Sequence, residues 1–139
     1  MTTAEIMANI NYNESLIDRY ESEIRELNSR ISVLSEIHGK YSALQTDFDA
    51  RIGSRKNKLN TTGVVENKIF SKFYEGMSNL LSGKEYEAAR NSPSEAKGKI
   101  DSKVSEYEES IAKKQGDISY LKGRNEYWRS QLQYAEDAQ

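Results

Sequence analysis

Apolar residues recur at alternating spacings of three and four, and this heptad repeat constrains the fold more than any other feature of the chain. Side chains at these spacings lie on one stripe of an α-helix. Position a of the first repeat holds Ile10, Ile17, Ile24, Ile31, His38, Gln45 and Ile52, and position d holds Asn13, Tyr20, Leu27, Leu34, Tyr41 and Phe48. A narrow stripe of this kind predicts helices that pair along a shared seam.

The first helix has recognisable ends. Thr2 to Glu5 has the spacing of a capping box, in which a threonine and a glutamate three residues later satisfy the first backbone amides. Asn60 and Gly63 can take up the turn at the other end. We therefore expect a helix over residues 3–59. At about 1.5 Å per residue such a helix measures roughly 75 to 80 Å, which predicts a rod.

The last part of the chain repeats the pattern. Its seam residues are Ile100, Val104, Tyr107, Ile111, Lys114, Ile118, Leu121, Asn125, Trp128, Leu132 and Ala135. Ser92-Pro93-Ser94-Glu95 puts a serine at the N-cap, a proline at the first helical position and a glutamate at the third. The pattern predicts a helix over residues 93–136.

The segment between the two repeats is apolar over a wider arc. Its apolar residues are Val65, Ile69, Phe70, Phe73, Met77, Leu80 and Leu81. A helix with so broad an apolar face is usually covered from two sides, here by the flanking helices or by another protein. We expect a shorter middle helix over residues 64–89. The chain then turns either at Gly83 or only at Ser92-Pro93, where "EYEAAR" is itself helix-prone.

The fold class that follows is all-α: an elongated antiparallel helical bundle or coiled-coil hairpin of two long helices plus the middle helix, in one domain of 139 residues. Composition agrees with this fold class, because 36% apolar and 30% charged residues are enough for a narrow apolar seam but too few apolar residues for a thick globular core. The first helix is longer than the third, so it would overhang the third helix or continue into a partner.

Composition also argues against several functions. A net charge of −2 disfavours nucleic acid as the main partner, and the basic run 51–58 is better explained by the helix dipole. Cysteine is absent and His38 is the only histidine, so we expect no metal site, no cofactor and no catalytic constellation. No window is apolar enough to insert into a membrane, and the N-terminus lacks the pattern of a secretory signal. We expect a non-enzymatic protein.

The faces away from the seam carry a second pattern. Many outward positions hold small residues, among them Gly116 and Gly123, although a mid-helix glycine costs about 1 kcal/mol relative to alanine. Tyr120, Tyr127 and Tyr134 recur every seven residues at position c, beside Trp128. An aromatic row beside small residues is typical of a protein interface. The alternatives are a solvated face rich in serine and glycine, and tyrosines covered by the first or middle helix.

The region "FSKFYEGMSNLLSGKEYEAA", Phe70 to Ala89, resembles the YwqH-like small helical proteins encoded beside LXG polymorphic toxins, which are similar to the Trp-x-Gly helical hairpins of type VII secretion. Leu81-Ser82-Gly83-x-x-Tyr86 stands where the hairpin family has Trp-x-Gly and a later aromatic residue. Leu81 replaces the tryptophan. None of the nine tyrosines is followed four positions later by aspartate or glutamate, so the secretion motif Tyr-x-x-x-Asp/Glu is absent.

This resemblance implies an accessory or targeting protein that binds the helical N-terminal domain of a cognate LXG toxin, with or without a second small helical partner. It leaves open whether the protein stays in the cytoplasm or is exported with the toxin. The residues expected to bind the partner are Phe70, Phe73, Met77, Leu81, Gly83, Tyr86, Gly116, Tyr120, Gly123, Tyr127, Trp128 and Tyr134. The competing interpretation is a self-associating structural coiled-coil scaffold, a homo-oligomer that needs no partner.

Overall fold

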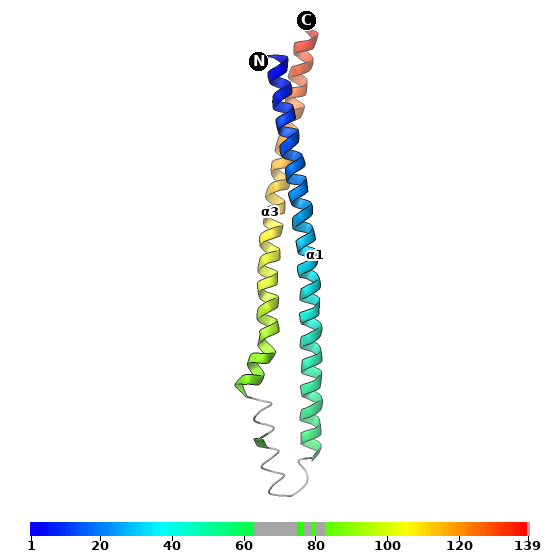
Figure 1. Cartoon of the computed structure of the whole chain (residues 1–139), viewed down its shortest axis with the longest axis vertical. Coiled ribbons are helices and arrows are strands. Elements are labelled where there is room, and N and C mark those ends of the chain that lie inside the picture. The colour runs from blue at the N-terminus through cyan, green and yellow to red at the C-terminus, as the bar shows by residue number, and fades with distance from the viewer. Residues whose placement is uncertain (63–74, 77–78, 80–82, 139) are drawn as a thin grey trace. The chain divides into compact units, whose positions relative to one another are not determined.

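The computed structural model describes residues 1–62, 75–76, 79 and 83–138 and contains two long α-helices, α1 (Thr3–Thr62) and α3 (Lys84–Asp137) (Figure 1). No strand occurs in these described ranges. The predicted all-α class is therefore confirmed, with two helices packed together.

The predicted capping box at the start of α1 is confirmed. The Glu5 amide donates to Oγ1 of Thr2 at 3.2 Å, and the Thr2 amide donates to Oε2 of Glu5 at 2.8 Å. Two amides that the helix itself leaves without acceptors are satisfied in this way. The hydrogen bond from the Thr2 backbone also lowers the pKa of the Glu5 carboxyl, because it favours the charged form.

The predicted helix start at Pro93 is wrong. α3 begins at Lys84, and its first turn closes with a hydrogen bond of 3.1 Å from the Glu87 amide to the Gly83 carbonyl. Pro93 lies inside the helix. A proline removes one backbone hydrogen bond and disfavours helix for the preceding residue, but strong helix formers such as those in "KEYEAAR" favour continuation. Propensity and cross-helix contacts therefore outweigh the local N-cap signal.

The prediction of three helices is not matched by the structure. The predicted middle helix, 64–89, loses its last six residues to α3, because α3 starts at Lys84. Most of its remaining length lies outside the described residues.

Contacts divide the chain into two units. Unit 1 comprises residues 1–33 and 103–139, and unit 2 comprises residues 34–102. In unit 1 the early part of α1 packs against the later part of α3 in antiparallel order, because Asn13 contacts Asn125 whereas Glu23 contacts Lys114. Both chain termini consequently lie at one end of this unit (Figure 1).

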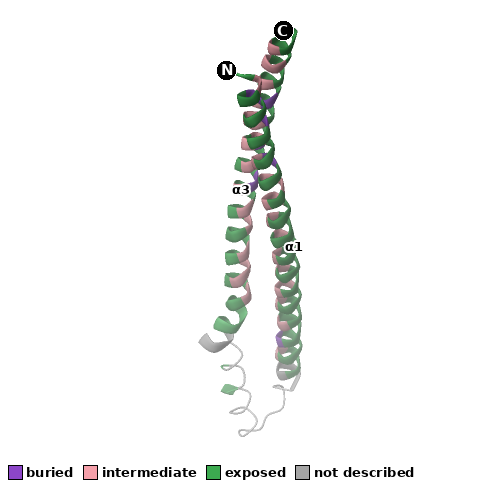
Figure 2. Cartoon of the chain, turned by 45° about the horizontal axis from the view of Figure 1, so that its top comes forward, coloured by how far each residue is buried: buried purple, intermediate pink, exposed green. Residues whose placement is uncertain are grey.

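The core of unit 1 is a single seam, as the heptad predicts (Figure 2). Its buried residues are Ile6, Ile10, Ile17, Ile111, Ile118 and Asn125. Every other predicted a or d residue that falls in unit 1 is half-buried. Two helices bury only one stripe each, so the unit has no second layer to cover the outward positions.

Unit 2 pairs the later part of α1 with the first part of α3, also in antiparallel order. Polar contacts connect the two segments along their length: His38 with Asp101 at 3.4 Å, Gln45 with Ser94 at 2.6 Å, and Asp49 with Arg90 at 3.4 Å. Ile52 is its buried apolar residue among those described. Two seam positions of α1, His38 and Gln45, therefore use hydrogen-bonding groups in place of apolar packing.

Candidate functional site

The three tyrosines at position c of α3 are exposed. Tyr120 is 68% exposed, Tyr127 47% and Tyr134 72%. α1 therefore leaves much of each tyrosine side chain uncovered. The predicted middle helix, 64–89, lies mostly outside the described residues. A tyrosine is amphipathic and loses little conformational entropy when it is buried, so exposed tyrosines at regular intervals suit a protein interface.

A small residue precedes each of these tyrosines by four positions. The three pairs are Gly116 with Tyr120, Gly123 with Tyr127, and Ser130 with Tyr134. Residues four apart are neighbours on one face of a helix, and helical side chains lean toward the N-terminus, so each tyrosine lies beside a small residue. Apart from its chain neighbours and the backbone of its own helix, a Cβ added at Gly116 or Gly123 would meet no described atom within 4 Å. Packing among the described residues therefore does not explain the two glycines.

Arg124 lies among the tyrosines. Its guanidinium carbon is 5.0 Å from the ring centroid of Tyr127 and 5.2 Å from that of Trp128, and these two rings meet edge to face at 5.1 Å. Arg124 is half-buried, as is Trp128 in the seam. We call the surface of Gly116, Tyr120, Gly123, Arg124, Tyr127, Ser130 and Tyr134 the tyrosine face.

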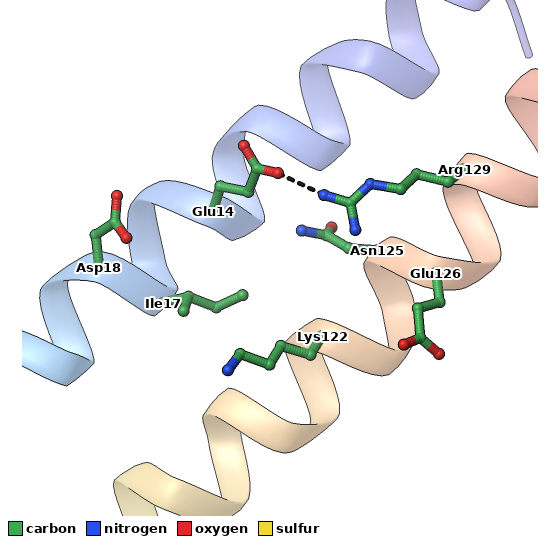
Figure 3. A pocket seen from close by; sticks show the side chains of 7 residues that line it. All are labelled: Glu14, Ile17, Asp18, Lys122, Asn125, Glu126 and Arg129. Atoms are coloured by element: carbon green, nitrogen blue, oxygen red, sulfur yellow. Dashed lines mark hydrogen bonds and ion pairs between the residues drawn. The ribbon is translucent and has the colours of Figure 1, made fainter.

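The helices of unit 1 carry charged residues along their e positions, on a different side from the tyrosine face. Figure 3 shows a groove there, lined by Glu14, Ile17, Asp18, Lys122, Asn125, Glu126 and Arg129. Arg129 donates to Glu14 at 2.6 Å, and Lys122 lies 3.8 Å from Glu21. In Figure 3, Asp18 and Glu126 point away from the other side chains. The cations of this groove are thus already paired across the hairpin.

A deeper polar contact lies beneath that groove. Asn125 is 1% exposed, and its Oδ1 accepts a hydrogen bond of 2.9 Å from Nδ2 of Asn13. Its own Nδ2 donates to the Ile10 carbonyl at 3.4 Å. No buried side-chain nitrogen or oxygen among the described residues lacks a hydrogen-bond partner. This geometry fits a role for the two asparagines in setting the register of the seam.

The predicted binding residues separate into three groups. Gly116, Tyr120, Gly123, Tyr127 and Tyr134 come together on the tyrosine face, with Trp128 at its edge. Gly83 closes the first turn of α3, and Tyr86 falls within that helix. The positions of Phe70, Phe73, Met77 and Leu81 lie outside the described residues.

Sequence reasoning missed two members of this side of unit 1. Arg124 is one of them. It lies three positions before Tyr127 and four before Trp128, and residues at these spacings are neighbours on a helix, so the sequence could have predicted that it lies near both rings. Tyr12 of α1 is the other, 65% exposed at position c of its own repeat.

The described part of the chain contains no group of three or more histidine, cysteine, aspartate or glutamate side chains placed to hold a metal ion. Within it, neither helix includes a stretch long and apolar enough to cross a membrane. No family model, curated protein or solved structure matches the chain. The fold and the tyrosine face together define an all-helical protein with an uncovered aromatic surface.

Proposed function

We propose that this protein is a non-enzymatic accessory factor that binds the helical N-terminal domain of an LXG toxin and supports its type VII secretion. The observation that carries the proposal is the exposure of the tyrosine face. Its three tyrosines leave roughly 400 Å² uncovered, taking about 200 Å² for a whole aromatic side chain. That is about half of the ~800 Å² that each partner contributes to a standard interface.

The glycines of the face support a helical partner in particular. Small residues let two helix backbones approach closely, and no described side chain lies within 4 Å of a Cβ built at Gly116 or Gly123. Each glycine reduces helix stability by about 1 kcal/mol relative to alanine. A partner helix that packs there would offset that cost.

The resemblance of Phe70 to Ala89 to the YwqH-like proteins supports the identity of the partner. In this proposal the cognate toxin supplies the helices, a second small helical protein joins the complex, and Phe70, Phe73, Met77, Leu81 and Tyr86 extend the contact surface. The protein acts in the cytoplasm, where it holds the toxin domain in an export-competent state and accompanies it to the secretion machinery.

The proposal predicts that an LXG toxin is encoded beside the gene, and co-expression with the N-terminal domain of that toxin tests it. The two proteins should co-elute in size-exclusion chromatography. Replacing Tyr120, Tyr127 and Tyr134 together with alanine should weaken the complex by at least 100-fold, because buried interface tyrosines commonly contribute more than 1 kcal/mol each. The melting temperature of the free protein should change by only a few degrees, since exposed substitutions cost within about 0.5 kcal/mol.

The matched control is the double variant Ile37→Ala and Leu44→Ala, which removes exposed apolar side chains from α1 in unit 2. It should leave toxin binding unchanged. Failure of the wild-type protein to co-elute with the toxin domain would overturn the proposal. An equal loss of binding and of thermal stability in the triple variant would instead place the tyrosines in a structural role.

A second candidate function, a self-associating scaffold, is favoured by Ile37 and Leu44. These residues lie seven apart at position g of α1, and both are exposed. Two copies of the chain could bury them against each other as a coiled-coil seam. Light scattering on the purified protein should then show a dimer or larger species, and the Ile37→Ala and Leu44→Ala double variant should convert it to a monomer.

A further inference from the structure

We infer that the occupant of the tyrosine face is an amphipathic α-helix that carries a carboxylate, and that this carboxylate pairs with Arg124. The identity of the partner protein rests on the proposed function. The chemistry of the occupant rests on the charge and the period of the face itself.

The period of the face favours a helix. Its tyrosines and its small residues each recur every seven positions, which is about 10.5 Å along α3. A packed helix presents side chains at the same interval, with knobs that fit between those of its neighbour. A helix laid along α3 would therefore place a side chain against each small residue and each tyrosine in turn.

The charge of the face favours a carboxylate. Within the described ranges, no aspartate or glutamate oxygen comes within 4 Å of the Arg124 side chain, although nearby cations are paired: Arg129 with Glu14 at 2.6 Å, and Lys114 with Glu23 at 3.1 Å. The Arg124 guanidinium stacks on Tyr127 and Trp128, and the residue is half-buried. A helix that covers the tyrosines would remove water from this cation as well. Burying a cation without a partner is costly, so the covering helix must provide an anion.

A carboxylate also matches the geometry of the guanidinium. Arginine presents its donors in a planar fork that fits the two oxygens of a carboxylate, and hydrogen bonds between charged groups are the stronger ones. Aspartate or glutamate near the centre of the partner's stripe would thus determine both affinity and register. Asp117 occupies the same heptad position as Arg124 one repeat earlier, so a second carboxylate there would be repelled.

Synthetic helices test this inference without the toxin. Three 28-residue peptides carry an alanine and leucine heptad and differ at one central flanking position, which is Glu, Gln or Lys. Trp128 is the only tryptophan of the chain and contacts Arg124, so its fluorescence reports occupancy of the face. The Glu peptide should bind about tenfold more tightly than the Gln peptide, and the Lys peptide most weakly.

Variants of the protein assign the preference to one residue. Arg124→Gln should remove the tenfold advantage of the Glu peptide, and Arg124→Glu should reverse the order in favour of Lys. The control Arg129→Gln removes a cation of the charged groove and should keep the wild-type order. Equal binding of the three peptides, absence of binding, or an unchanged order in Arg124→Glu would overturn the inference.

The same variants separate this inference from the proposed function. If the toxin domain co-elutes with wild-type protein and equally well with Arg124→Glu, the accessory function stands and the carboxylate is refuted. If the toxin domain fails to bind but the Glu peptide is preferred, the helical acidic occupant stands and the accessory function is refuted.

Discussion

Replacing Asn13 and Asn125 together with leucine should stabilise unit 1 and loosen the register of its two helices. Asn125 is 1% exposed in a seam built mainly of isoleucine, and Asn13 beside it is half-buried. Asn13 donates to Asn125 at 2.9 Å, and Asn125 donates to the Ile10 carbonyl at 3.4 Å. These two hydrogen bonds compensate the amides for the loss of water.

The expected gain in stability follows from replacing hydrogen bonds by apolar burial. Two hydrogen bonds contribute about 1 kcal/mol each to folding, so their loss costs about 2 kcal/mol. A fully buried leucine contributes roughly 2 kcal/mol and a half-buried leucine roughly 1 kcal/mol. The double variant should therefore gain about 1 kcal/mol in the free energy of unfolding. Asn125→Leu alone should be less stable than the double variant, because Asn13 then loses its acceptor.

The expected loss of register follows from the alternatives that the asparagines exclude. If α1 and α3 slipped by one heptad within unit 1, Asn125 would face Ile6 or Tyr20 in place of Asn13. The hydrogen bond between the two amides would be lost and the buried Asn125 oxygen would be left without a donor, so the observed register is favoured by about 1 to 3 kcal/mol. With two leucines this difference disappears, as it does when a seam asparagine is removed from a coiled coil.

Urea unfolding measures the first effect, and distances between spin labels measure the second. The chain has no cysteine, so cysteines placed at the exposed Ser22 and Ser119 can be labelled without background. A slip by one heptad displaces the labels by about 10.5 Å along the helix axis. The wild-type protein should give one distance and the double variant a broadened or split distribution. A double variant that is less stable than wild type, or that keeps one unchanged distance, would refute the reasoning.

Three further predictions concern stability alone. Replacing Gly116 or Gly123 with alanine should raise the free energy of unfolding, measured with urea, by about 1 kcal/mol, since an added Cβ meets no described atom within 4 Å outside its own helix backbone. A loss of stability would contradict this prediction, because it would mean that the added Cβ clashes with another part of the protein. Pro93→Ala should stabilise α3 by up to about 3 kcal/mol, because alanine restores a backbone N–H that can donate inside the helix. If helicity and stability in urea unfolding do not change, the alanine amide does not form that hydrogen bond. The hydrogen bond with Lys114 lowers the pKa of the Glu23 carboxyl in the folded state. The pair therefore stabilises the folded state at pH values above the pKa of Glu23 in the unfolded chain. That stabilisation is lost as the pH falls through the lower pKa of the folded state. Stability should thus decline below about pH 4.5, less steeply in Glu23→Gln, and parallel pH profiles of the two proteins would contradict this.

The seam could be predicted from the sequence because a heptad repeats the same information many times. A single polar residue such as His38 or Asn125 does not disturb a pattern supported by isoleucine at the neighbouring turns. The start of α1 was equally predictable, since the Thr2 to Glu5 capping box is local and its hydrogen bonds form within one turn.

The start of α3 could not be read in the same way, because two local signals conflict there. Ser92 and Pro93 indicate a new helix, whereas "KEYEAAR" indicates a continuing one. Contacts distant in sequence favour continuation: Gln45 bonds to Ser94 at 2.6 Å, and Asp49 lies 3.4 Å from Arg90, so α1 meets residues on both sides of the proline.

The tyrosines and glycines of the candidate site were predictable from the sequence, but their exposure was not. Tyrosines at position c lie on the face away from the seam, where a third helix could cover them, and the sequence alone does not determine whether one does. The geometry also added Arg124, whose stacking on Tyr127 and Trp128 depends on side-chain conformation that spacing cannot fix.

The polar contacts of unit 1 differ in a way that bears on function. In the seam and in the charged groove, polar side chains of α3 bond to side chains of α1: Asn125 to Asn13, and Arg129 to Glu14. These contacts form within the chain, so they determine how the helices pair before any partner is bound. Arg124 lies instead among exposed tyrosines and beside a glycine with open space around it. The groups that hold unit 1 together are therefore distinct from those of the tyrosine face, so substitutions on that face should test the proposed binding without unfolding unit 1.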